Sequence, residues 1–211
     1  MKHFKMILAA LVGCLFATVL LAGCNRTTNS PSNVFLALDA TGSNKEKKDD
    51  YSAAAHAVIS GLPNTSFKGT MVGFGGSNGV TKIYDGNITD PDDLAQSFSD
   101  YWKGPSPKGK GTFWAALLDR LSKVTEPTSV MIFTDGEIYD IDACKGLVKQ
   151  IAANTKIKAV FIGPVIAESQ YGDQWRSKIE NLFAPLGDRL FVAGVNDRGA
   201  QIEAFTEYVK K

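Results

Sequence analysis

Residues 34–43 read Val-Phe-Leu-Ala-Leu-Asp-Ala-Thr-Gly-Ser, so five apolar side chains run straight into an aspartate and two hydroxyl residues. A short, continuously apolar run is typical of a strand that is covered on both faces of a parallel sheet. Three further runs have this character, at residues 130–133, 158–162 and 189–193. The run at 130–133 also ends in polar residues, Thr-Asp-Gly-Glu.

Helical patterns lie between and after these runs, and two β-like runs stand apart from them. The helical patterns cover residues 49–61, 91–103, 113–124, 141–154, 173–186 and 197–210. Strands that alternate with helices of this length indicate βαβ units. The runs at 68–75 and 80–84 are joined by Gly-Ser-Asn-Gly, a hairpin signal. The predicted fold class is α/β: a Rossmann-like three-layer sandwich with a mostly parallel central sheet, one antiparallel edge strand and helices on both faces.

Length and composition are those of one globular domain with a leader. The chain has 211 residues, and 23 Lys and Arg oppose 22 Asp and Glu, for a formal charge of +1. This balance argues against a nucleic-acid binder or a polybasic membrane-surface protein. Two of the basic residues, Lys2 and Lys5, lie in the first 23 positions, so the remaining 188 residues carry a charge of −1.

Residues 1–23 resemble a secretory signal peptide, because a short basic start precedes an uncharged apolar run over residues 6–22. The sequence Leu-Ala-Gly-Cys at 21–24 resembles the bacterial lipobox, which implies that Cys24 carries lipid (palmitate or a similar acyl chain) and becomes the mature N-terminus. An uncleaved anchor helix with an incidental cysteine is the alternative, and it too would place the domain outside the cytoplasm.

The residues after Cys24 extend this interpretation. Residues 25–32 are polar and predict a flexible tether. The expected organisation is therefore a lipoprotein signal peptide at 1–23, a lipidated cysteine and tether at 24–32, and a domain at 33–211. A residue other than Asp at Asn25 favours the outer membrane, with the domain facing the periplasm, if the cell is Gram-negative.

Oxygen-bearing side chains follow two of the predicted strands and open one predicted helix. Asp39, Thr41 and Ser43 come after the first strand, Asp135 comes after the run at 130–133, and Thr112 follows a Gly-rich turn. Ligands of open α/β sheets bind at the carboxyl ends of strands. Carboxylates and hydroxyls are hard ligands that suit Mg²⁺, Mn²⁺ or Ca²⁺ and are poor for zinc or copper.

Helix capping is the alternative for acidic and hydroxyl residues at such positions. Capping of the helix that follows is the only role expected for Asp140, Asp142 and Asp173. Cys144, beside apolar positions of a predicted helix, is expected to be a buried core thiol. Phe113 and Trp114 follow Thr112 directly, and at least one of the two rings should be in the core, whereas an exposed Trp114 would make a contact anchor.

The pattern Asp39-x-Thr41-x-Ser43, then Thr112, then Asp135 in Thr-Asp-Gly resembles the metal-ion-dependent adhesion site (MIDAS) of von Willebrand factor type A (VWA) domains. The family's first motif is Asp-x-Ser-x-Ser, so Thr41 is a substitution that keeps the hydroxyl and adds a methyl group. The resemblance implies a VWA-like fold in which Thr41, Ser43 and Thr112 hold a divalent cation directly. It implies that the two aspartates act directly or through water, and that an acidic residue of a protein partner completes the coordination.

Two enzyme classes are the main rivals. Residues 104–111 nearly match the phosphate-binding loop, but Gly111 stands where that loop needs Ser or Thr, and no strand precedes it. Lys108 and Lys110 in this stretch are expected to be solvated. Phosphatases that form an aspartyl phosphate resemble this fold, but they need a second acid where Thr41 stands. A structural module with a vestigial metal site is a third alternative.

The sequence therefore predicts a membrane-anchored lipoprotein of the bacterial cell envelope with no catalytic residues. Its domain would bind Mg²⁺, or Mn²⁺ or Ca²⁺, and through it a protein partner, without nucleic acid or nucleotide. In VWA relatives with switchable affinity, the last helix shifts when the following segment is pulled. The predicted last helix here ends at the end of the sequence, at Lys211, which predicts fixed affinity or switching by metal alone.

Overall fold

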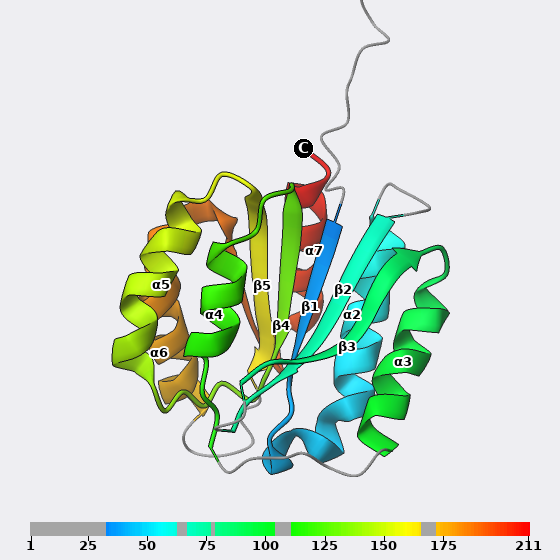
Figure 1. The fold of residues 1–211 in the computed structure, drawn as a ribbon, viewed down its shortest axis with the longest axis horizontal. Coiled ribbons are helices and arrows are strands. Elements are labelled where there is room, and N and C mark those ends of the chain that lie inside the picture. Colours follow the sequence, from blue (N-terminus) through cyan, green and yellow to red (C-terminus); the bar gives the residue numbers. More distant parts are fainter. Residues whose placement is uncertain (1–32, 63–66, 77–78, 104–110, 166–171) are drawn as a thin grey trace, which may run out of the picture.

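The computed structural model describes residues 33–62, 67–76, 79–103, 111–165 and 172–211. In this part of the chain six strands form one sheet in the order β3-β2-β1-β4-β5-β6 (Figure 1). The strands are β1 (Asn33–Asp39), β2 (Phe67–Phe74), β3 (Thr81–Ile88), β4 (Thr128–Phe133), β5 (Ile157–Val165) and β6 (Leu190–Gly194). Every pair is parallel except β2 with β3, which confirms the predicted antiparallel edge strand.

Helices cover both faces of this sheet and bury two separate hydrophobic clusters. α4, α5 and α6 pack on one face, and α2, α3 and α7 pack on the other. The α-helices are α2 (Lys48–Gly61), α3 (Pro91–Lys103), α4 (Ala115–Ser122), α5 (Ile141–Ala153), α6 (Gly172–Phe183) and α7 (Arg198–Val209). Two 3₁₀ helices, η1 (Gly42–Lys47) and η2 (Ala184–Arg189), complete the order. The predicted three-layer α/β sandwich is confirmed.

Three of the four apolar runs read from the sequence, those in β1, β4 and β5, are buried on both faces, whereas the run at 189–193 forms the edge strand β6 and is only partly buried. In β1 the side chains of Phe35 and Ala37 belong to one hydrophobic cluster, whereas Val34, Leu36 and Leu38 belong to the other. All six residues of β4 are buried in the same way. A central strand with helices on both sides has no polar face, so its sequence does not alternate.

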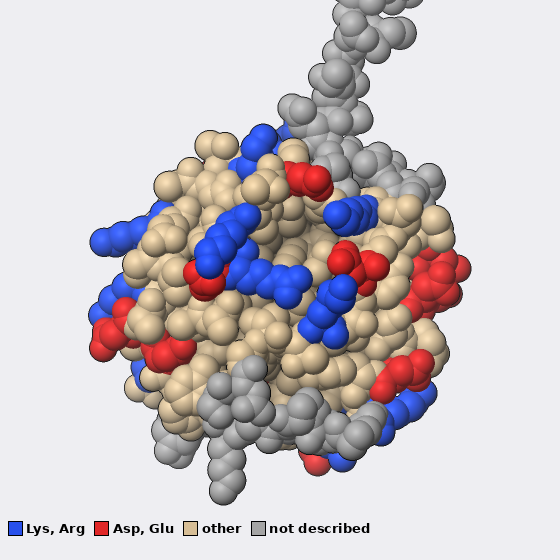
Figure 2. All heavy atoms as spheres, in the orientation of Figure 1, with Lys and Arg blue, Asp and Glu red and all other residues tan. Residues whose placement is uncertain are grey.

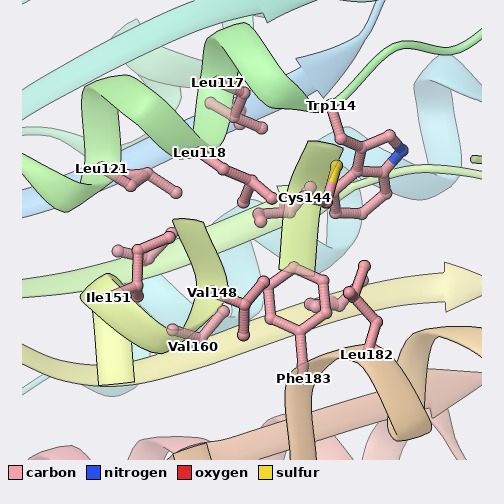
Figure 3. Close-up of a cluster of buried hydrophobic side chains, with 14 of the residues drawn as sticks. Trp114, Leu117, Leu118, Leu121, Cys144, Val148, Ile151, Val160, Leu182 and Phe183 are labelled. Atoms are coloured by element: carbon pink, nitrogen blue, oxygen red, sulfur yellow. The ribbon is translucent and has the colours of Figure 1, made fainter. Parts of the chain in front are cut away.

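The cluster under α4 contains two residues whose roles the sequence left open (Figure 3). Trp114 and Cys144 are both fully buried there, and the indole packs edge-on against Phe74 with ring centroids 5.3 Å apart. Burial raises the pKa of the Cys144 thiol to about 12, with a further contribution from the neighbouring Asp140. The expected core thiol is therefore confirmed.

The largest difference from the predicted elements is at the sheet edge. β3 was expected over residues 80–84 but runs from Thr81 to Ile88. Only Ile88 of this strand is buried. An edge strand that covers little core carries few apolar residues, so the apolar pattern shows only part of its length.

The chain enters the sheet at one end of the strands, and the parallel strands run toward the other end. β1 begins at Asn33, at the end of the molecule where the C-terminus also lies (Figure 1). The expected signal peptide, Cys24, the tether, Lys108 and Lys110 lie outside the described residues. Within the described ranges, no helix is both long and apolar enough to cross a membrane.

Candidate functional site

The sheet order brings the two predicted aspartates together. β1 and β4 are neighbours with Leu38 paired to Phe133, so the residues that follow each strand leave the sheet side by side. The Thr41 hydroxyl donates to Oδ1 of Asp39 at 2.7 Å, and the Ser43 hydroxyl donates to Oδ2 of Asp135 at 2.6 Å. The two hydroxyl oxygens lie 3.3 Å apart. Four of the five predicted ligands therefore form one hydrogen-bonded cluster.

Thr112 reaches the same edge of the sheet through its backbone. Its carbonyl accepts a hydrogen bond from the Tyr139 N–H at 3.0 Å, and the carbonyl of Gly111 accepts one from the Gly76 N–H at 2.9 Å. The Thr112 side chain is fully buried, and its hydroxyl has no hydrogen-bond partner in the described part of the chain. A buried hydroxyl without a partner costs about 1–3 kcal/mol, so this oxygen has an unused capacity to bind.

Asp39 is the most strongly perturbed acid of the cluster. Its side chain is 0% exposed, and its pKa is raised from 3.8 to about 7, with burial as the largest cause. The nearby Asp135 carboxylate is the second cause of this rise, and hydrogen bonds from Thr41 and Thr134 partly offset it. A cation beside both carboxylates would favour their charged forms, so the electrostatics of the cluster suit a positive ion.

Three supporting residues were not predicted from the sequence. The Thr134 hydroxyl donates to Oδ2 of Asp39 at 2.8 Å, so each carboxylate oxygen of this aspartate accepts a threonine hydroxyl. The amide of Asn44 donates to the Thr41 hydroxyl at 3.0 Å, and the Tyr51 phenol donates to the Asn44 carbonyl oxygen. Thr134 stands in the Thr-Asp-Gly motif and could have been found there, whereas no sequence pattern links Asn44 and Tyr51 to the site.

The methyl group of Thr41 occupies a place that only glycine leaves free. Gly75, just after β2, has φ of +108°, and a Cβ there would lie 2.9 Å from Cγ2 of Thr41. The same Cβ would lie 3.4 Å from Oδ1 of Asp39. The methyl group by which Thr41 differs from a serine is therefore accommodated by the glycine that follows the neighbouring strand.

Asp140 caps a different helix from the one expected. Its two carboxylate oxygens accept hydrogen bonds from the backbone N–H groups of Trp114 and Ala115, both at 2.8 Å. These groups open α4, while Asp140 makes no side-chain cap to α5, the helix that follows it. The expectation that its side chain caps the next helix is wrong, because both carboxylate oxygens accept from the N–H groups at the start of α4 instead.

The rim of the site carries two exposed aromatic rings. Phe113 is 40% exposed and Tyr139 is 59% exposed, and their ring centroids are 5.9 Å apart. Trp114 is instead fully buried, so it is a core residue and cannot act as the contact anchor that an exposed tryptophan would provide. The aromatic surface beside Thr112 comes from its direct neighbour in sequence and from the loop after β4.

The donor set limits which cation the cluster could hold. Across the described ranges, no group of three or more His, Cys, Asp and Glu side chains could hold a metal ion. The cluster offers two carboxylates and hydroxyl oxygens instead, which is a hard donor set with few charges. These residues fit Mg²⁺, Mn²⁺ or Ca²⁺ with water in the other positions, and they do not fit zinc or copper.

The fold is similar to that of several solved proteins. The chain is similar to an aerotolerance-related membrane protein from Bacteroides fragilis, with a TM-score of 0.58 and 12% identity over 84% of this chain and 98% of that one. It is similar to a von Willebrand factor type A structure from Catenulispora acidiphila, with a TM-score of 0.58 and 14% identity over 86% of this chain and 42% of that one. It is also similar to the manganese-loaded TRAP protein of Plasmodium vivax, with a TM-score of 0.54 and 16% identity over 85% of this chain and 75% of that one.

Sequence comparison adds nothing to this likeness. No protein-family model matches the chain, and no curated protein matches it. At 12–16% identity the structural similarity shows the fold alone. That fold is a VWA-like α/β sandwich.

Proposed function

We propose that this domain is a membrane-anchored module of the bacterial envelope that binds a divalent cation and, through it, an acidic residue of a protein partner. The ligands would be Asp39, Thr41, Ser43, Thr112 and Asp135. The observation that carries the proposal is the buried Thr112 hydroxyl without a partner, at the sheet edge where the other four residues form one cluster. Mg²⁺ is the first candidate, with Mn²⁺ or Ca²⁺ as alternatives.

The present hydrogen bonds are compatible with a cation. A hydroxyl has one proton and two lone pairs, so Ser43 can donate to Asp135 and still offer an oxygen lone pair to a metal ion. Thr41 can do the same while it donates to Asp39. The cluster is therefore arranged to bind a cation without losing the bonds that position its hydroxyls.

The charge of the cluster explains why a partner would present an acid. Two carboxylates only neutralise a divalent ion, and hydroxyl ligands add no charge. An open coordination position on that ion would therefore attract Asp or Glu from another protein. The manganese-loaded TRAP structure supports a cation in a fold of this kind.

The proposed lipid anchor on Cys24 places the site away from the membrane. The tether of residues 25–32 joins the domain at Asn33, whereas the cluster lies beyond the other end of β1. A strand of seven residues spans roughly 23 Å, so the site would face outward from the membrane surface.

A phosphatase is less compatible with the geometry. The nucleophilic aspartate of such an enzyme must reach a phosphoryl group, but Asp39 is 0% exposed. Thr41, which stands where a second acid would be needed, is also buried and is hydrogen-bonded to Asp39. The proposed role is therefore binding without catalysis.

Crosslinking from membranes tests the proposed function. The full-length protein should capture a partner in Mg²⁺, release it on chelation, and fail to capture it as Asp39→Ala. Asp142→Ala is the matched control, because Asp142 is exposed and forms a surface ion pair with Lys145. The same capture by the wild type and by Asp39→Ala would contradict the proposal. Loss of membrane association and of palmitate labelling in Cys24→Ala would test the anchor separately.

A further inference from the structure

Two hollows flank the end of the sheet where the chain enters, and the proposed metal site uses neither. The sheet-face hollow has a volume of about 380 Å³, and the residues that line it include Asn33, Phe35, Lys68, Arg120, Lys123 and Glu126. The α7-side hollow has a volume of about 500 Å³, and the residues that line it include Ile157, Lys158, Arg189, Tyr208, Val209 and Lys211. Figure 2 shows Lys and Arg side chains around a hollow near the end of the molecule where β1 begins, with some Asp and Glu side chains among them.

The strand register places the two hollows next to each other. Asn33 pairs with Lys68 on one side and with Thr128 on the other, and Thr128 pairs with Ile157. These residues form one row across four strands, and neighbouring strands lie about 4.8 Å apart. Both hollows are therefore within about 15 Å of the point at which the chain enters the sheet.

The residues that line these hollows are strongly unbalanced in charge. Six are Lys or Arg and one is acidic, Glu126. That carboxylate already accepts a hydrogen bond from the Asn33 side chain at 2.6 Å. The hollow between α2 and α7 is different, because Arg198 and Lys210 line it together with Glu203 and Glu207. The excess of positive charge therefore distinguishes the two hollows at the chain-entry end from the hollow between α2 and α7.

Two of these six cations are occupied within the protein. Lys123 pairs with Asp119 at 2.7 Å. Arg189 donates to backbone carbonyl oxygens at the end of α5 and the start of β5, including that of Ile157 at 2.8 Å. The position of the Arg189 guanidinium is therefore fixed by the fold, and its charge is not neutralised by those contacts.

The other four cations have no acidic partner in the described part of the chain. They are Lys68, Arg120, Lys158 and Lys211. The guanidinium of Arg120 lies over the Phe35 ring, 5.7 Å from its centroid, which holds the charge at the mouth of the sheet-face hollow. Positive side chains fixed at hollows without counter-charges are suited to bind anionic groups from outside.

We infer that the two hollows bind anionic phospholipid head groups of the membrane to which the chain is anchored. The choice of a membrane as the source of the anions rests on the proposed lipid at Cys24. Eight tether residues span at most about 28 Å, so they would hold this end of the domain beside the lipid surface. Tyr208, a partly exposed aromatic side chain that lines the α7-side hollow, suits the boundary between head groups and water. Head-group binding would fix the orientation of the domain, with the metal site directed outward.

Vesicle binding tests this inference without the anchor. Residues 25–211 contain every described helix and strand and both hydrophobic clusters, so this fragment is expected to fold without the leader. Its sedimentation should be measured with vesicles of phosphatidylcholine alone and with vesicles that contain about one quarter phosphatidylglycerol. Each Lys or Arg near an anionic surface contributes about 1 kcal/mol, which corresponds to about fivefold in partitioning.

A matched pair of double variants separates the hollows from overall charge. Lys68→Gln with Lys158→Gln removes one cation from each hollow and should weaken binding to the anionic vesicles about 25-fold. Lys45→Gln with Lys47→Gln removes two positive charges from η1, at the opposite end of the strands, and should leave binding to the anionic vesicles unchanged. Circular dichroism would show that each variant is folded.

Three results would overturn the inference. They are equal binding to both kinds of vesicle, an equal loss in the two double variants, and binding of inorganic phosphate or of an acidic polypeptide through Lys68 and Lys158 without any preference for phosphatidylglycerol. Because the fragment lacks Cys24, each result stands whether or not that cysteine carries lipid. Palmitate labelling of the full-length chain tests the anchor by itself.

Discussion

At the scale of single residues, the cluster is controlled by the burial of Asp39. This carboxyl is fully enclosed and accepts hydroxyl hydrogen bonds from Thr41 and Thr134 on different oxygens. The hydroxyls partly offset the loss of water, but the pKa is still raised to about 7 because burial and Asp135 outweigh them. The site therefore stores unfavourable electrostatic free energy that a bound cation would relieve.

This burial predicts a pH dependence of stability in the metal-free protein. The pKa of Asp39 is about 7 in the folded protein and near 3.8 in the unfolded chain, so the folded state holds this proton more tightly. The stabilisation that the protonated Asp39 gives to the folded state is fully present below pH 3.8 and is lost as the pH rises through 7. The free energy of unfolding should fall by about 4 kcal/mol across this range.

Urea unfolding with chelator, at a series of pH values, measures this fall. Asp39→Asn should remove most of it, because the amide does not titrate. Its oxygen can accept one of the two hydroxyl hydrogen bonds, and the other hydroxyl would have to turn and accept from the amide NH₂. Saturating Mg²⁺ should restore the stability of the wild type near neutral pH. An unchanged pH slope in Asp39→Asn would show that another group is responsible.

The contact between Gly75 and Thr41 predicts a rescue by a second substitution. Gly75→Ala puts a Cβ 2.9 Å from the Thr41 methyl group, and it also places alanine at a φ of +108°. The cost should be about 1–3 kcal/mol of unfolding free energy. Thr41→Ser removes the methyl group, so the double variant should recover part of this loss in urea unfolding. No recovery would mean that backbone strain alone sets the cost.

At the scale of elements, one aspartate joins two helices that flank the site. Asp140 precedes α5 in sequence but caps the start of α4, directly after Thr112. The Trp114 indole also donates to the Glu137 carbonyl at 3.0 Å. The loop after β4 and the start of α4 are thus held together, which positions Thr112 relative to Asp135.

Removal of this cap should destabilise the fold and loosen the site. Asp140→Ala leaves two backbone N–H groups at the start of α4 without their acceptors, which should cost about 1–2 kcal/mol. Asp142→Ala, two residues later on the exposed surface, should change stability by less than about 0.5 kcal/mol. Equal effects in urea unfolding would mean that the bonds from Asp140 contribute nothing particular.

Much of the fold was predictable from the sequence, because the central strands are buried on both faces. The apolar character of residues 34–38 and 130–133 predicts β1 and β4, and the polar residues that follow each strand indicate the candidate site. The full length of β3 could not be read in this way, because an edge strand need not be apolar. The helix capped by Asp140 and the contact between Gly75 and Thr41 depend on segments that meet only in the folded protein.

At the scale of the whole molecule, the two ends of the sheet differ in chemistry. The acidic and hydroxyl cluster lies at the carboxyl ends of β1 and β4, whereas Lys and Arg side chains line the two hollows at the end of the sheet where β1 begins. The parallel strands separate the two kinds of side chain, because residues that follow the strands and residues that precede them lie at opposite ends of the sheet. In the proposed function, one end faces a partner and the other faces the membrane.

Calorimetric titration of residues 25–211 with Mg²⁺ and Mn²⁺ tests the proposed metal site most directly. The wild type and the exposed control Asp142→Ala should give the same heat of binding, and Asp39→Ala, if folded by circular dichroism, should give none. A folded Asp39→Ala that binds either ion with the same heat and affinity as the wild type would contradict the site, and so would a wild type that binds neither ion.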